Sequence, residues 1–373
     1  MPFCSGSSSR GLRILSAGFL CLAFPWGKTG AEEKAGNRPI SRLLFGSCLK
    51  QDQPAPIFEA ILDREPELFV FLGDNIYADT TDMELMGQRY AQLGRIPGFI
   101  ELKKRCPVEA TWDDHDFGAN DAGASYEKRE GSEKHFLDFW EVPEDSQRRK
   151  REGIYGARID GPVGRRLQLI LLDTRYFRGP LKQGPERRVG GPYVPSDDPA
   201  VTLLGEAQWA WLEEQLKQPA DLRILASSIQ CVAEDAGQET WSNLPRERSR
   251  LFSLIRETKA EGILVISGDR HWAELSVEKE NAPYPIYDFT SSSLNTDHGR
   301  GTPTENRFRH LPRTWHEANF GELAIDWSAE GRNVSLRLFD RVGKAVFEKV
   351  IPFAELRMPE VTGVESEAPA EGR

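Results

Sequence analysis

Short apolar runs that each end in a turn of polar residues restrict the fold of this chain more than any other feature. They are Arg42–Phe45, Leu68–Leu72, Val108–Trp112, Leu167–Leu172, Ile224–Ala226 and Ile263–Ile266. Continuous apolar runs of this length are typical of strands that are buried on both faces. Helical patterns lie between them, at Pro56–Arg64, Met83–Leu93, Leu204–Leu216 and Pro245–Lys259. This alternation of strand and helix predicts an α/β core.

The pattern changes after Tyr284, where only strands are indicated. The expected strands are Ile286–Thr290, Gly321–Trp327, Asn333–Asp340 and Ala345–Ile351. They predict a sheet-building C-terminal part of the same domain. Residues 178–200 and 296–313 are rich in polar and turn-forming residues, so we expect two long surface loops there.

Composition places the chain among soluble globular proteins. It has 373 residues, of which 39% are hydrophobic and 28% charged, and its net charge is −10. Binding to nucleic acid in general requires a basic face, so we expect no stable nucleic-acid partner. Only five cysteines are present, which excludes a disulfide scaffold. The sequence does not indicate an oligomeric state.

The N-terminus has the pattern of a secretory signal peptide, at residues 1–31. Arg10 and Arg13 precede an apolar run at Ile14–Trp26, and the small residues Gly30 and Ala31 follow it. The run is short for a helix that crosses a bilayer, which needs about 20 residues. We therefore expect an exported protein, periplasmic or secreted, with no membrane span in the mature chain. An uncleaved anchor is the alternative.

The C-terminal tail, residues 359–373, is acidic and has little apolar content. A segment of this kind cannot bury enough apolar surface to fold by itself, so we expect it to be disordered.

Residues that can carry chemistry gather in the turns that follow the predicted strands. They are Cys48, Asp74, Asn75, Tyr77, the run Asp113–Asp116, Asp269 and His271. In open α/β sheets, ligands bind outside the carboxyl ends of the strands. We therefore expect these side chains to surround one site, although they are far apart in the chain.

The residue types indicate a metal centre. A tyrosine phenolate and a cysteine thiolate become good ligands only beside a strongly charged cation that lowers their pKa values. Carboxylate and phenolate are hard anions, which favour trivalent iron. If Cys48, Asp74, Tyr77, Asp114 and Asp269 all ionise, their five negative charges match one ferric and one divalent ion. Without metal these groups would repel one another, and most would stay protonated.

Four separated motifs carry a family resemblance. They are Gly73–Tyr77, Trp112–Asp121, Leu172–Arg175 and Ser267–His271. Together, and in this order, they resemble the alkaline phosphatase D (PhoD-like) family of the calcineurin-like metallophosphoesterase superfamily. The resemblance covers roughly Arg42–Ile351, and we assign the domain to residues 40–353. It implies an α/β fold in which two mixed β-sheets pack as a sandwich flanked by helices, four layers in all.

The resemblance also implies roles for individual residues. Asp74 would bridge two metals. Cys48, Tyr77 and His271 would hold the first, a ferric ion, and Asp114, Asn120 and Asp269 would hold the second, a divalent ion such as Ca2+. His115 would be the acid that assists the leaving group, and Asn75, Arg175 and Arg270 would contact phosphate oxygens.

The implied reaction is hydrolysis of a small phosphomonoester or phosphodiester by a metal-bound hydroxide. Asp and Asn oxygens suit Ca2+, Mg2+ and Mn2+ alike, and Zn2+ is a further alternative for the divalent ion.

Several alternatives stay open at this point. Asp113 is interpreted as a support for Asp114, although either carboxylate can be the ligand. Asn120 matches the family pattern more loosely than the other candidates, and Cys48 alone would be read as a small buried apolar residue. For the whole chain, the alternatives are a mononuclear metal esterase and a non-catalytic envelope binding protein that retains the fold.

Overall fold

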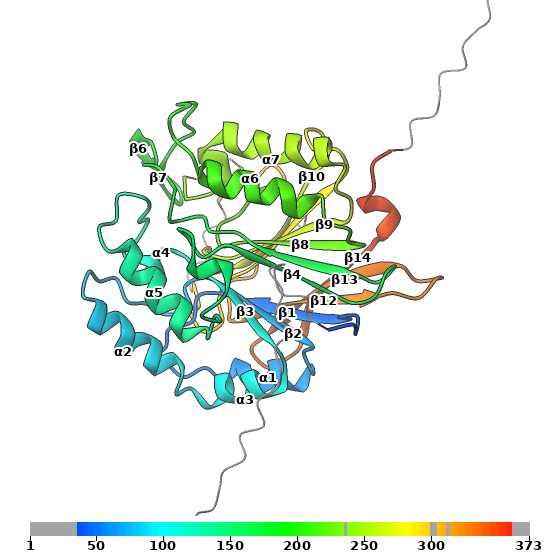
Figure 1. Ribbon diagram of the computed structural model, residues 1–373, viewed down its shortest axis with the longest axis horizontal. Helices are drawn as coiled ribbons and strands as arrows, with labels where there is room; N and C mark the ends of the chain where they lie inside the picture. Colours follow the sequence, from blue (N-terminus) through cyan, green and yellow to red (C-terminus); the bar gives the residue numbers. More distant parts are fainter. Residues whose placement is uncertain (1–35, 235–236, 299–303, 311–313, 360–373) are drawn as a thin grey trace, which may run out of the picture. The chain divides into compact units, whose positions relative to one another are not determined.

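Two six-stranded mixed sheets face each other, and helices cover the outer face of each (Figure 1). The structure is a computed structural model that describes residues 36–234, 237–298, 304–310 and 314–359. The predicted signal peptide and residues 360–373 of the predicted tail lie outside the described residues. None of the described helices is long and apolar enough to cross a membrane.

The first sheet combines an early parallel half with a late antiparallel half. Its strand order is β14-β13-β12-β1-β2-β3. The parallel strands are β1 (Arg42–Gly46), β2 (Leu68–Leu72) and β3 (Val108–Thr111). The antiparallel strands are β12 (Asn319–Asp326), β13 (Asn333–Asp340) and β14 (Ala345–Pro352). The C-terminal strands thus complete the sheet that the N-terminal strands begin.

The second sheet has the order β10-β11-β9-β8-β5-β4. Its four central strands are parallel: β11 (Ile286–Ser291), β9 (Ile263–Ser267), β8 (Leu222–Ser227) and β5 (Leu167–Leu171). The two edge strands are antiparallel to their neighbours: β10 (Ala273–Glu278) and β4 (Gly156–Asp160). Every residue of the four central strands is buried, as their continuous apolar runs predict.

Alternate side chains of the first sheet enter two different hydrophobic cores. Phe45 packs into the core between the two sheets. This core is continuous with the apolar residues of α6 (Gly205–Leu216) and α7 (Pro245–Thr258), which cover the far side of the second sheet. Leu44 packs into the other core, under the helices of the opposite layer. These helices are α1 (Ile57–Asp63), α2 (Met83–Leu93), α3 (Pro97–Arg105) and α5 (Arg129–Phe139). The predicted four-layer sandwich is therefore confirmed.

Four elements of the sandwich were not predicted: α3, α5, β4 and β10. The prediction of an irregular loop at 178–200 was also wrong in part, because β6 (Gln183–Arg188) and β7 (Gly191–Tyr193) form a hairpin there. This hairpin has an almost fully exposed first strand with no apolar alternation, so periodicity could not reveal it. It is held by backbone bonds instead, one of them from the Tyr193 nitrogen to the Gly237 oxygen (2.9 Å).

The remaining described elements are short. They are α4 (Asp114–Phe117), η1 (Gln147–Arg149), η2 (Trp241–Asn243) and η3 (Phe353–Leu356). Of these, α4 matters most for the site, because it begins directly after β3 and carries Asp114 and His115.

Candidate metal centre

The turns after β1, β2, β3 and β9 meet at one end of the sandwich. Among the described residues, four overlapping groups of potential ligands lie there, and the ligand atoms within each group are no more than 4.8 Å apart. The groups are Cys48–Asp74–His271, Asp74–Asp114–His115, Asp113–Asp114–Asp269 and Asp114–Asp121–Glu239. Asp74 belongs to two groups and Asp114 to three, so the arrangement suits two neighbouring cations.

The first cluster brings together the four residues predicted to hold the first metal. Cys48 Sγ and Tyr77 Oη each lie 3.3 Å from Asp74 Oδ2. Tyr77 Oη is also 2.9 Å from His271 Nε2. Ser292 joins this cluster from the second sheet, because its Oγ is 3.1 Å from Cys48 Sγ and accepts a 2.8 Å bond from the His271 backbone nitrogen.

The second cluster consists of Asp113, Asp114 and Asp269, of which the first two are buried. Asp114 is fixed by bonds that its own carboxylate accepts from the backbone nitrogens of His115 (3.0 Å) and Asp121 (2.7 Å). Asn120 is exposed, and no hydrogen bond joins its side chain to another candidate ligand within the described segments. Its role as a ligand stays a prediction.

Strained backbone marks the same positions. Cys48, Asp74, Asp269 and His271 all have left-handed backbone conformations, with φ values of 59°, 49°, 68° and 56°. This conformation costs a non-glycine residue roughly 1–2 kcal/mol, and such strain persists where the surrounding structure imposes it, often at functional sites. Four strained residues on three turns, all aimed at one place, indicate that the turns are shaped for a ligand.

Buried acceptors without a donor point to the kind of ligand. Asp74 Oδ1, Asn75 Oδ1 and Asp113 Oδ2 are buried and have no hydrogen-bond partner among the described residues. Buried polar atoms are normally paired, and an amide or ionised carboxylate oxygen can only accept. Cations satisfy such oxygens, so the residues present fit the metal centre that the family resemblance implies.

The pKa shifts agree with this assignment. Burial raises the pKa of Cys48 to about 11, and burial with nearby negative charge raises the pKa values of Asp74 and Tyr77 well above their usual range. Bound cations would reverse these shifts and stabilise the anions. Burial, together with the positive charge of Arg270, lowers the pKa of His271 to about 4, which keeps its imidazole neutral and able to bind a metal.

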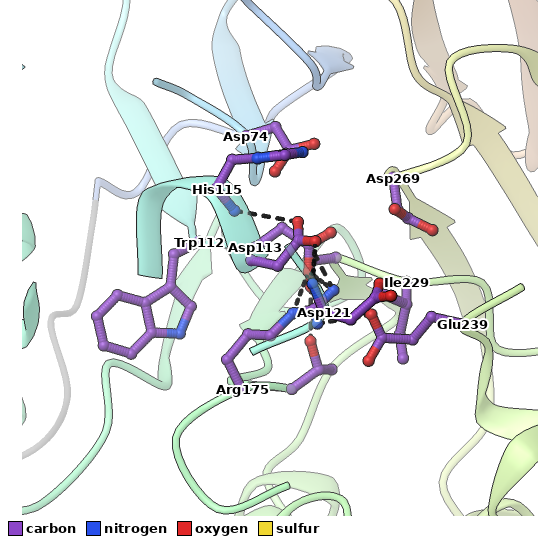
Figure 2. A network of polar contacts seen from close by, with 12 residues as sticks. Asp74, Trp112, Asp113, His115, Asp121, Arg175, Ile229, Glu239 and Asp269 are labelled. Carbon is purple, nitrogen blue, oxygen red and sulfur yellow. Dashed lines mark hydrogen bonds and ion pairs between the residues drawn. The ribbon is translucent and has the colours of Figure 1, made fainter. Parts of the chain in front are cut away.

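His115 shares a ligand group with Asp74 and Asp114, but its ring is held by a residue outside the two clusters. Its Nδ1 lies 2.7 Å from Asp79 Oδ1, its ring packs on Tyr77 at 4.3 Å, and its side chain is 18% exposed. Figure 2 shows it next to Asp74. Burial alone would lower the pKa of His115, but the bond to Asp79 and the nearby carboxylates outweigh burial and raise it. Since Nδ1 is engaged by Asp79 and no described residue bonds Nε2, the geometry directs Nε2 towards a substrate.

The predicted phosphate contacts are engaged with protein groups in this structure. Asn75 Nδ2 donates both to the Thr111 oxygen (2.9 Å) and to Asp116 Oδ2 (2.5 Å), so neither amide hydrogen is free. Arg175 is fully buried and donates to Asp113 Oδ1 (2.6 Å). Arg270 pairs with Asp269 at 2.6 Å and lies over the Trp272 ring. Their contact with phosphate stays a prediction.

Sequence reasoning missed three residues of the site: Asp79, Glu239 and Ser292. Asp79 lies two residues beyond the Gly73–Tyr77 motif and has a left-handed backbone (φ 46°), so the unusual spacing of acids in that turn was an available signal. Glu239 and Ser292 lie outside the four motifs, and only the fold brings them to the site.

Comparison with known proteins identifies the family. The sequence profile of the PhoD-like phosphatase family matches residues 43–334. The chain belongs to the PhoD-like phosphatase family.

A curated protein whose sequence is similar to this chain supports the family assignment. Alkaline phosphatase D of Bacillus subtilis (strain 168) is 25% identical in an alignment over 335 residues. The alignment covers 74% of this chain and 54% of that protein. The chain thus spans about half the length of this curated relative.

Two solved structures share the fold of this PhoD-like phosphatase family member. The structure of PhoD has a TM-score of 0.66 and 18% identity, covering 88% of this chain and 73% of that one. A dimetal phosphatase from Danio rerio has a TM-score of 0.53 and 13% identity, covering 84% and 99%.

Proposed function

We propose that this chain is a metal-dependent hydrolase of phosphoesters that acts through a binuclear centre. The observation that carries the proposal is the convergence of Cys48, Asp74, Asp269 and His271, all with left-handed backbone, around buried oxygens without donors. Family membership supports the class of reaction. The substrate is a small phosphomonoester or phosphodiester.

The two clusters offer different donor atoms, and this difference favours a different metal ion in each. The thiol of Cys48 and the phenol of Tyr77 stand together on one side of Asp74, which favours a ferric ion there. The other cluster offers only carboxylate oxygens, from Asp113, Asp114 and Asp269. A hard divalent ion suits it, Ca2+ or else Mg2+ or Mn2+, and Zn2+ is a further alternative.

Bound metals would polarise the phosphoester and bring the pKa of water towards neutrality. The protein's own residues supply the rest. His115, held at Nδ1 by Asp79, presents Nε2 to the leaving-group oxygen and donates a proton to it. Asp74 lies between the two clusters and keeps them adjacent.

We further propose that the protein is exported, in keeping with the signal-peptide pattern of residues 1–31. Fusion of residues 1–35 to a reporter enzyme that is active only outside the cytoplasm would test this proposal. Reporter activity supports export, and its absence, with the fusion present in the cytoplasm, contradicts it.

The test of the catalytic proposal is hydrolysis of 4-nitrophenyl phosphate and bis(4-nitrophenyl) phosphate by the purified chain. We expect turnover of at least one ester, its loss after chelation and its return on adding Fe3+ with Ca2+ or Mn2+. Asp74→Ala is the matched inactive variant. Metal binding without hydrolysis of either ester would favour the non-catalytic binding protein instead.

A further inference from the structure

Glu239 is a buried acid beside the carboxylates of the second cluster. It is 3% exposed, and its carboxylate lies within 4.8 Å of those of Asp114 and Asp121. It comes from the irregular segment that follows β8, far from the other site residues in sequence. Figure 2 shows it facing Arg175 and Asp121. No motif of the sequence gives it a role.

Glu239 lies within ion-pair distance of two buried arginines, and neither of its oxygens accepts a hydrogen bond from a described residue. Its Oε2 lies 2.6 Å from Arg175 Nη1, and its Oε1 lies 2.9 Å from Arg178 Nε. On the side away from Glu239, Arg175 Nη2 is 2.6 Å from Asp113 Oδ1 and 4.0 Å from Asp114 Oδ1. Arg175 therefore stands between Glu239 and the second cluster.

The second arginine leads to the same cluster by another path. Arg178 Nη2 donates to the backbone oxygen of Asp121. The Asp121 backbone nitrogen in turn donates to Asp114 Oδ2 at 2.7 Å. Both paths from Glu239 thus end on carboxylates of the second cluster.

A buried ion-pair network of this kind is weak evidence for a gain in stability. Arg175 and Asp113 are fully buried, and Glu239 nearly so. Removing charges from water at such depth costs several kcal/mol per ion, and apolar replacements for buried ion pairs are often neutral or stabilising. The location of the network against the metal-ligand candidates offers a different reason for its presence.

That reason is electrostatic. Arg175 places a positive charge within hydrogen-bond distance of Asp113, where it opposes the binding of a cation. The negative charge of Glu239, on the other side of the guanidinium, offsets this opposition. If Glu239 were neutral, Asp113 and Asp114 would be the described acids left within 4.0 Å of Arg175.

We propose that Glu239 is a positioning residue for the divalent cation, acting through Arg175 to keep Asp113 and Asp114 oriented and available. The inference rests on the proposed function, because it needs a cation at Asp113, Asp114 and Asp269. Groups of this kind, which orient ligands without touching the metal, typically change metal affinity by about ten- to a hundredfold when they are replaced.

The test is calorimetric titration of the metal-free full chain with Ca2+ alone, whose preference for oxygen ligands directs it to the second cluster. Glu239→Gln should weaken Ca2+ binding by about tenfold or more. Glu239→Asp keeps the negative charge and should therefore retain part of the Ca2+ affinity that Glu239→Gln loses. Glu322→Gln is the matched control, because Glu322 is also fully buried between two arginines, Arg64 (2.9 Å) and Arg337 (3.2 Å), but lies on β12 outside the site.

Weaker Ca2+ binding in Glu239→Gln, with normal binding in Glu322→Gln, supports the inference. Equal affinity in Glu239→Gln and the native chain overturns it, and so does equal weakening in both variants. If Glu239→Gln does not fold, Glu239→Asp decides: unchanged Ca2+ affinity and kcat overturn the inference, and a weaker affinity supports it. A native chain that binds Ca2+ but hydrolyses no ester refutes the proposed function alone, whereas one that binds no Ca2+ refutes this inference.

Discussion

The imidazole of His115 and the carboxylate of Asp79 are paired, with Nδ1 and Oδ1 2.7 Å apart. Asp79 makes this contact from a left-handed backbone (φ 46°), two residues beyond Tyr77. The pair fixes which ring nitrogen of His115 faces the substrate, so the two residues should act as a unit in proton transfer.

Asp79→Asn should therefore lower kcat by about ten- to a hundredfold and leave KM and metal content nearly unchanged. Removing the acid itself, by His115→Ala, should lower kcat by about a hundredfold or more. Steady-state kinetics and elemental analysis of both variants check this, with exposed Asp52→Asn as the control. Loss of metal from either variant would place His115 among the ligands instead.

Asp74→Ala should release both metals and abolish hydrolysis. Asp74 lies 3.3 Å from both Cys48 Sγ and Tyr77 Oη, and it also shares a ligand group with Asp114 of the second cluster. Elemental analysis after gel filtration provides the measurement, with Asp63→Ala on α1 as the control. A folded Asp74→Ala protein that turns over substrate without metal would contradict the assignment of the site.

Gly73 allows the turn before Asp74 to approach the turn after β3. Its φ is +95°, and an added Cβ would lie 2.5 Å from Asp113 Cβ. Gly164 has a similar φ (+84°), but its Cβ would meet nothing within 4 Å. Both alanine variants should lose roughly 1–2 kcal/mol through backbone strain, and Gly73→Ala should lose about 1–3 kcal/mol more through overpacking.

Urea unfolding of the two glycine variants measures this difference, and Ca2+ titration tests its effect on the site. Gly73→Ala should also bind Ca2+ more weakly, because the added methyl group displaces Asp113. Equal stability losses in Gly73→Ala and Gly164→Ala would show that the two turns are not in close contact in solution.

A pH-dependent stability effect is expected away from the metal centre, at Glu133 on α5. Burial, together with Asp173 and Glu152, raises the pKa of Glu133 to about 8 in the folded chain. Its protonated form is favoured by folding, so the stability that it contributes is present below about pH 4.5 and is lost as the pH rises to about 8.

Glu133→Gln mimics the protonated form and should remove this loss. Its melting temperature should exceed that of the native chain by about 2–4 °C at pH 8, and the difference should disappear near pH 4. Differential scanning calorimetry across this range checks the prediction, with exposed Glu127→Gln before α5 as the control. A constant difference at every pH would rule out titration of Glu133 as its cause.

Local patterns predicted the buried strands and a site at their ends, whereas the family resemblance implied the four-layer sandwich and the ligands of the first metal. Continuous apolar runs such as Leu68–Leu72 are buried strands in the structure, and the turns that follow them meet at one end of the sheets, as the strand-end rule requires. Cys48, Tyr77 and His271 lie together in the turns that follow β1, β2 and β9, as predicted, and their role as metal ligands stays a prediction.

The rest of the site depends on contacts that no local pattern encodes. Glu239 reaches Arg175 from the irregular stretch just before η2, and a single acid in an irregular segment has no periodicity to mark it. The hairpin β6–β7 lacks apolar alternation, since its first strand is solvent-exposed. Arg175 was predicted to contact phosphate, but its burial against Asp113 was not foreseeable from sequence.

The most direct test of the central proposal is elemental analysis, with a visible spectrum, of the purified full chain. We predict about one iron and one divalent ion per chain, and a broad visible absorption from Tyr77 phenolate or Cys48 thiolate bound to iron. Tyr77→Phe should weaken or shift this band while Asp74→Ala removes it. Colourless protein that contains only zinc or manganese would contradict the ferric site, and protein that binds no metal after supplementation would contradict the metal centre itself.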